Sequence, residues 1–202
     1  MTIEASTVLI PPSYTTSSVT FMLEHDEIRN KKVKNKYENI INDFYSEAAE
    51  LINAGKDEIA IVSNASDGVN KILHSIQWKA GDVLLTTEVE YGNCYLNYLK
   101  LKEEKGIIVK IVPSDHDGNI LLKKMEEMIS SKVKLIAVTH IPTNSGLIMP
   151  AEKIGNIAKK HNILIVNDNP YSFVLNETQQ SILSIPGAKE VCLELNSLSK
   201  TF

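Results

Sequence analysis

The side chains best suited to chemistry follow segments that read as β-strands. Lys200 stands between two hydroxyl residues in LNSLSKTF (195–202), and Asp168 directly follows the apolar run ILIVN (163–167). A lysine amine can form a Schiff base with a carbonyl group, and a carboxylate at a strand end can hold a protonated ring nitrogen. The alternative interpretations are a solvated lysine and an aspartate that caps a helix or turn.

A second candidate lies in VSNASDGVN (62–70), which places Ala65 and Ser66 at the expected start of a helix. Backbone N–H groups and the helix dipole favour a phosphate at such a position. The alternative is that Ser66 simply caps the helix.

The segment THIPTNSGLIMP (139–150) carries Thr143 and Asn144, which could hydrogen-bond a ligand ring, although a plain turn is the alternative. His140 in the same segment is expected to be a strand-end histidine with its own hydrogen-bond partner rather than a catalyst.

These candidates need a scaffold that gathers them, and the pattern of the chain from residue 58 onward predicts one. Strands alternate with helices, which indicates βαβ units and a three-layer α/β domain with a mainly parallel sheet. In such sheets ligands bind beyond the carboxyl ends of the strands, where all the candidates are expected to lie. The expected strands are 58–64, 82–88, 107–113, 133–141, 163–168 and 188–197, and the expected helices are 66–76, 93–106, 119–131 and 151–162.

The N-terminal part has a different pattern. Apolar residues recur at three- and four-residue spacing over 36–52, which predicts a helix with one apolar face. Residues 1–34 are the least regular and are expected to form an arm. Residues 35–202 are expected to form the N-terminal part of one domain.

Composition excludes some functions. The chain has 202 residues, a net charge of −4 and a pI near 5.8, so nothing indicates binding to nucleic acid or to an acidic membrane surface. Two distant cysteines indicate neither a disulfide framework nor a metal site, and free thiols suit a reducing compartment. No apolar run approaches the ~20 residues of a membrane span, and the first residues lack the features of a secretory signal. A cytoplasmic protein is expected.

Taken together, the candidates are the parts of a pyridoxal 5′-phosphate (PLP) site: a phosphate cradle, an acid for the ring nitrogen, groups that bind the ring, and a lysine. From about residue 35 to its end, the sequence resembles the fold-type-I PLP enzymes of the aminotransferase superfamily. Up to about residue 165 it resembles class V, the group of cysteine desulfurases and isopenicillin-N-epimerase-like proteins, in DEIAIVSNASDGVN, LLTTEVEYGN and LIAVTHIPTNSGLIMPAEKIGNIAKKHNI. Residues 166–202 resemble class I/II aminotransferases in NDNPYSFVLNE and ELNSLSKTF.

The resemblance implies a role for each candidate. Lys200 would be the Schiff-base lysine, and Asp168 would pair with the pyridine nitrogen. Tyr171 would hydrogen-bond the phenolate oxygen of the cofactor, and Tyr91 would stack on its ring. Thr143 stands where the family commonly has an asparagine that contacts the phenolate oxygen, and Asn144 is its neighbour. The residues implied in phosphate binding are Ala65, Ser66, Ser197 and Ser199.

The implied function is that of a PLP-dependent enzyme acting on an amino acid or its 2-oxo acid, with transamination as the first expectation. The alternatives are a class V lyase, epimerase or desulfurase, and a non-catalytic fragment or pseudoenzyme. The resemblance further implies that the chain stops short of the family's C-terminal regions, where the catalytic cysteine of the desulfurases would lie, and that the full-length protein is a homodimer.

Overall fold

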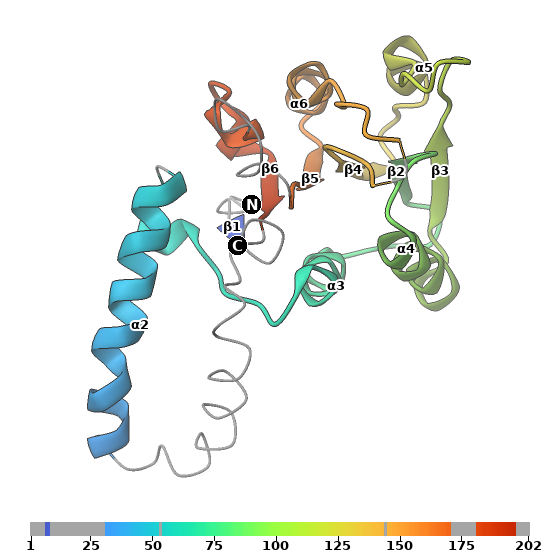
Figure 1. Cartoon of the computed structure of the whole chain (residues 1–202). Helices are drawn as coiled ribbons and strands as arrows, with labels where there is room; N and C mark the ends of the chain where they lie inside the picture. Colours follow the sequence, from blue (N-terminus) through green and yellow to red (C-terminus); the bar gives the residue numbers. More distant parts are fainter. Residues whose placement is uncertain (1–6, 9–30, 53, 144, 171–180, 197–202) are drawn as a thin grey trace.

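A parallel sheet of six strands forms the centre of the molecule, in the order β1-β6-β5-β4-β2-β3, with every neighbouring pair parallel (Figure 1). The computed structural model describes residues 7–8, 31–52, 54–143, 145–170 and 181–196, with the backbone alone for 7–8, 31–36, 51–52 and 184. The strands are β1 (Thr7–Val8), β2 (Val83–Thr87), β3 (Ile108–Val112), β4 (Val133–Thr139), β5 (Leu164–Asp168) and β6 (Cys192–Leu195).

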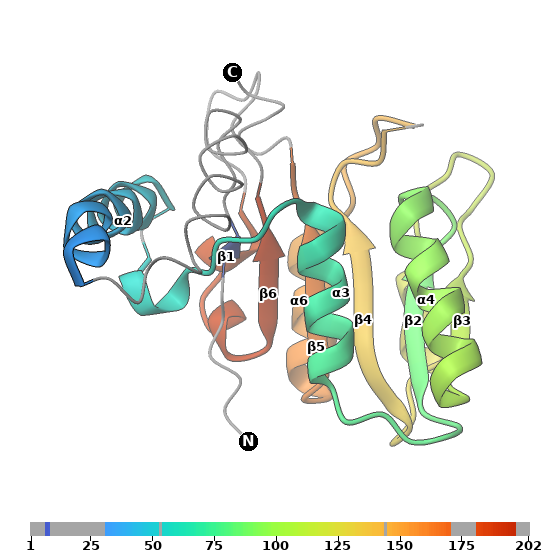
Figure 2. The same ribbon diagram turned by 90° about the horizontal axis from the view of Figure 1, so that it is seen from below.

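Helices cover both faces of this sheet, as the three-layer prediction required. Figures 1 and 2 show α3 (Ala65–Ser75) and α4 (Gly92–Lys105) on one face. Figure 1 shows α5 (Leu122–Glu127) and α6 (Ala151–Lys160) on the other. The short helices η1 (Lys56–Glu58), η2 (Ile182–Ser184) and η3 (Ala188–Glu190) lie in connections, and α2 (Lys31–Ile52) precedes them all.

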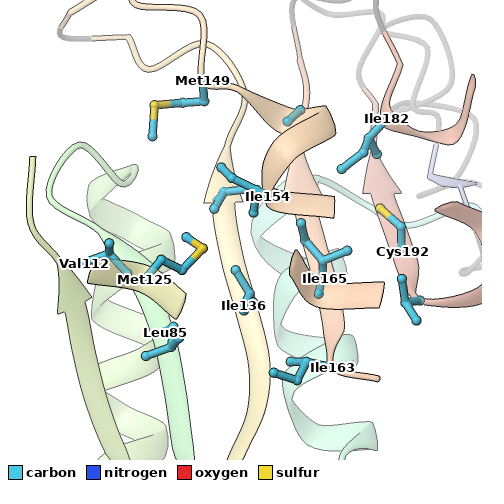
Figure 3. Packing of buried hydrophobic residues seen from close by; sticks show 14 of the residues in the cluster. Leu85, Val112, Met125, Ile136, Met149, Ile154, Ile163, Ile165, Ile182 and Cys192 are labelled. Carbon is cyan, nitrogen blue, oxygen red and sulfur yellow. The ribbon is translucent and has the colours of Figure 1, made fainter. Parts of the chain in front are cut away.

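The core follows from strand geometry, because successive side chains of a strand point to opposite faces. On β4, Leu135 packs with α3 and α4, and Ile136 packs with α5 and α6. Figure 3 shows the cluster that contains Ile136, which lies between Met125 and Ile165. Because the central strands are buried on both faces, they read as continuous apolar runs in the sequence.

Three expected elements differ from the structure. The run expected as a strand over 58–64 joins no strand of the described sheet: its first residue ends η1, where the Glu58 carboxylate accepts the Gly55 N–H at 2.7 Å, and its last is the N-cap of α3. The helix expected over 119–131 is shorter: Ser114 and Ile120 form an antiparallel bridge before α5, and Met128 caps its end. The strand expected over 188–197 begins as η3, and β6 itself covers Cys192–Leu195, while residue 197 lies outside the described residues.

One close approach positions α3. A Cβ atom on Gly68 would lie 3.0 Å from Leu195 and 3.3 Å from Val62, closer than side chains ordinarily pack. Glycine therefore lets α3 approach the end of β6, and the start of the helix lies beyond the carboxyl edge of the sheet (Figure 2).

The expected N-terminal helix is confirmed as α2, which stands apart from the sheet (Figure 1). Where its side chains are described, the buried residues of α2 are Ala48 and Ala49, which form a small cluster with Ile59. Ile40 and Ile41 on the same helix are exposed. Among the described helices, none is long and apolar enough to cross a membrane. The expected arm lies mostly outside the described residues, apart from β1 and the start of α2.

Candidate functional site

The carboxyl ends of the central strands meet at one edge of the sheet, as predicted. Asp168, the last residue of β5, lies in register with Thr139 at the end of β4 and with Leu195 at the end of β6. The strand that leads toward Lys200 therefore ends beside Asp168. Five predicted site residues lie outside the described part of the chain: Asn144, Tyr171, Ser197, Ser199 and Lys200.

Asp168 is the described carboxyl group whose pKa is clearly raised. Burial raises the pKa of its carboxyl group to about 7, and the nearby negative charge of Glu90 acts in the same direction. Among the described residues, none donates a hydrogen bond to the Asp168 carboxylate. A desolvated carboxylate in this state gains from a cationic partner, because an opposite charge favours its ionised form.

The start of α3 was predicted to bind an anion, and its N-cap geometry bears on that prediction. Asn64 is the N-cap, and its Oδ1 accepts the Asp67 N–H at 2.9 Å, so the interpretation of Ser66 as the cap is wrong. The Asp67 carboxylate pairs with Lys71, which offsets its charge. Within the described residues no oxygen accepts a hydrogen bond from the backbone N–H of Ala65 or Ser66. Unpaired N–H groups of a first helical turn favour an anion such as phosphate.

Tyr91 lies at the start of α4, where it is the N-cap residue and 48% exposed. Its neighbour Glu90 is held at the edge of the sheet by hydroxyl groups of Thr86, Thr139 and Tyr98. Nothing in the sequence indicated a role for Glu90. The only available signal was the polar residues at the ends of two otherwise apolar strands.

His140 has the structural role expected of it. Its ring is buried, with Nδ1 3.4 Å from Oδ1 of Asn169, and its backbone N–H donates to the Asp168 carbonyl at 3.0 Å. Thr143 is exposed in the following loop, so the structure leaves it accessible to a ligand without showing a contact.

Neither cysteine is suited to nucleophilic chemistry. Cys94 and Cys192 are both free and buried, and burial raises the pKa of each thiol. The thiolate is the nucleophilic form, and both environments disfavour it. In the described part of the chain, no group of three metal-ligating side chains is found.

The family model "Aminotransferase class-V" matches residues 9–178 of the chain. The match passes residue 165, where the resemblance to class V was expected to give way to class I/II, and it includes Asp168. A mitosomal cysteine desulfurase of Trachipleistophora hominis is 32% identical over 153 residues, which cover 71% of this chain and 34% of the relative.

Solved structures of PLP-family enzymes are also similar to this chain. The apo cysteine desulfurase of Thermococcus onnurineus NA1 matches with a TM-score of 0.59 and 28% identity, over 65% of this chain and 34% of that chain. A mutant of the cystine C–S lyase C-DES with glycine linked to its PLP cofactor matches with a TM-score of 0.63 and 18% identity, over 77% of this chain and 43% of that one. At that identity the likeness shows the fold alone. The chain spans about a third of the length of the curated relatives it matches.

Proposed function

The chain belongs to the class-V aminotransferase family, and from this membership we propose that it forms the cofactor-binding part of a PLP-dependent enzyme that removes sulfur from an amino acid. The transaminase expected first from the sequence is less well supported than the desulfurase or lyase alternative, because the named relatives are cysteine desulfurases. The substrate proposed is therefore a small sulfur-containing amino acid such as cysteine.

The observation that carries this proposal is the state of Asp168. It is a desolvated carboxylate at the carboxyl edge of a parallel sheet, with a pKa near 7 and no hydrogen-bond donor among the described residues. A protonated ring nitrogen supplies both the charge and the donor that this carboxylate lacks. The start of α3, at the same edge, fits the phosphate of the same molecule.

PLP, when bound, supplies an electron sink for bond cleavage at the amino acid. Asp168 would keep the ring nitrogen protonated, and the backbone N–H groups of Ala65 and Ser66 would hold the phosphate. Tyr91 would lie against the ring. Lys200, outside the described residues, is proposed to attach the cofactor covalently and then to move a proton at the substrate Cα. A nucleophilic thiol for the sulfur is not offered by Cys94 or Cys192, which are buried with raised pKa values.

The cofactor site is tested by reductive trapping. The protein is incubated with PLP, reduced with borohydride and mapped by peptide mass spectrometry. We expect the adduct on Lys200 and its loss in Lys200→Ala. The control is Lys189→Ala, which removes an exposed lysine that forms an ion pair with Glu58, and this variant should keep the adduct. An adduct on Lys189 or Lys160, or none at all, would contradict the proposed site.

The reaction is tested by the products formed from L-cysteine. With a thiol reductant present, a desulfurase gives alanine and sulfide while the reductant becomes disulfide. A transaminase instead gives a 2-oxo acid and requires a second 2-oxo acid as amino acceptor. Alanine and sulfide are expected. A 2-oxo acid that keeps the sulfur and forms only with an amino acceptor present would restore the transaminase interpretation, whereas pyruvate with sulfide and ammonia would indicate the lyase.

Two further properties are proposed without a direct observation of either. A homodimer is supported by the apolar side chains of Ile40 and Ile41, which are 48% and 36% exposed on α2. A cytoplasmic location is supported by the two free, buried cysteines, which suit a reducing compartment. Sedimentation of the protein tests the first, and fractionation of the source cells tests the second.

A further inference from the structure

Glu90 has more hydrogen-bond donors around it than an ordinary loop carboxylate. Its Oε2 accepts from the hydroxyl groups of Thr86 at 3.2 Å and Tyr98 at 3.4 Å. Its Oε1 accepts from the Thr139 hydroxyl and from the Tyr91 N–H, the latter at 2.8 Å. The negative charge of Glu90 acts on its surroundings, because it helps to raise the pKa of the nearby Asp168.

The donors come from separate elements that meet at the site. Thr86 lies on β2, Thr139 ends β4, and Tyr98 lies on α4. Thr139 is also the register partner of Asp168 on β5. Thr139 therefore donates to Glu90 and also lies beside Asp168, the residue proposed to bind the ring nitrogen.

We propose that Glu90 is a positioning residue of this site, which fixes Tyr91 at the start of α4 against the ends of β2 and β4 and favours a cationic group at Asp168 through its negative charge. The identity of the cationic group rests on the proposed function. The positioning of Tyr91 does not, because it follows from hydrogen bonds within the chain.

The charge argument depends on the groups around Asp168. The described side chains that bear on it are Glu90, Cys94 and Tyr98, with His140 at the end of the adjacent strand. Burial raises the pKa of Cys94 and Tyr98, so both are neutral near pH 7. The ring of His140 is directed to Asn169. Glu90 is therefore the described group that adds negative charge beside Asp168.

Two substitutions separate the two roles. Glu90→Gln keeps the size of the side chain, and its amide can accept from Tyr91 N–H and donate to the hydroxyl oxygens, but it carries no charge. Glu90→Ala removes both the hydrogen bonds and the charge. Glu88→Gln is the matched control, because Glu88 is an exposed carboxylate two residues away that accepts the Ser114 N–H at 3.0 Å.

The first measurements use the protein without cofactor. Carboxyl ¹³C NMR follows the titration of Asp168, and hydrogen exchange follows the Tyr91 amide. We expect Glu90→Gln to lower the titration midpoint of Asp168 and to keep the protection of the Tyr91 amide. Glu90→Ala is expected to lower both, and Glu88→Gln neither. If Glu90→Ala fails to fold, Thr139→Val serves instead, since it removes one donor to Glu90 and should also reduce Tyr91 protection.

The last measurement compares the affinity for PLP with that for its 1-deaza analogue, which has no ring nitrogen to protonate. Glu90→Gln should reduce the preference for PLP on the order of tenfold, the size of one short-range charge interaction in a polar site. An unchanged Asp168 titration and an unchanged preference would overturn the electrostatic role, and unchanged Tyr91 protection in Glu90→Ala would overturn the positioning role. If PLP does not bind at all, the proposed function fails, while the titration and exchange data still decide the role of Glu90.

Discussion

Replacing Asp168 by asparagine should make the protein without cofactor more stable at neutral and alkaline pH. The pKa of the carboxyl group is raised from 3.8 to about 7 in the folded chain, chiefly by burial. A raised pKa means that the folded state binds the proton more tightly than the unfolded state does. The stability that this group contributes is therefore complete below about pH 4 and is lost as the pH rises through 7.

The size of the effect follows from the shift. About three pKa units at 1.36 kcal/mol each give a loss on the order of 4 kcal/mol between pH 4 and pH 8. The asparagine side chain has no charge to desolvate, so Asp168→Asn should avoid that loss. The variant should equal the wild type near pH 4 and exceed its unfolding free energy by up to about 4 kcal/mol at pH 8.

Urea unfolding at several pH values measures this difference. The single tryptophan, Trp78, is a suitable probe, because its Nε1 donates to the Leu73 carbonyl at 2.7 Å and this contact is lost on unfolding. Asp43→Asn on the exposed face of α2 is the control and should follow the wild type. Parallel curves for wild type and Asp168→Asn across pH 4–8 would refute the idea that the fold holds a desolvated carboxylate at this position. The same variant should bind PLP more weakly. The two results together would show that the folded chain is less stable at neutral pH because Asp168 is kept buried for binding the cofactor.

Three further outcomes are expected from urea unfolding. Asn64→Ala removes the N-cap of α3 and should cost about 1 kcal/mol, with weaker binding of PLP than in wild type. Glu194→Ala should cost about 3 kcal/mol or more, because four donors would lose the Glu194 carboxylate as an acceptor. These donors belong to Asn167, Ser181, Ile182 and Asn196. A cost below about 1 kcal/mol would contradict this. Ile136→Ala should cost about 2–5 kcal/mol, because its side chain is fully buried between helices and sheet.

The position of Asp168 could be predicted because it needs only a local pattern. A buried strand is an apolar run, and the residue that follows it lies at the carboxyl edge of a parallel sheet. The same reasoning predicted the layers and placed the start of α3, the proposed phosphate site, at the same edge of the sheet. It was wrong over 58–64, an apolar run that reads as a strand but that connects η1 to the N-cap of α3 without joining a strand of the described sheet.

The role of Glu90 could not be predicted from the sequence. Its partners Thr86 and Thr139 are 53 positions apart in sequence and meet only because β2 and β4 are neighbours in the sheet. Hydroxyl residues at strand ends are common, and no periodic pattern links them to one glutamate. The pKa of Asp168 was unpredictable for the same reason, since it depends on burial by elements that are distant in the chain.

The position of β1 has a consequence for the order in which the protein folds. Thr7 pairs with Glu194, so β1 lies beside β6 although 187 positions in the sequence separate the two residues. Closing a loop of that size costs roughly 5 kcal/mol of chain entropy, and the two-residue strand cannot offset this alone. The pairing must therefore follow assembly of the other five strands. During synthesis β1 cannot pair until β6 has emerged, and the β6 edge then stays open to pairing with other chains until β1 joins it.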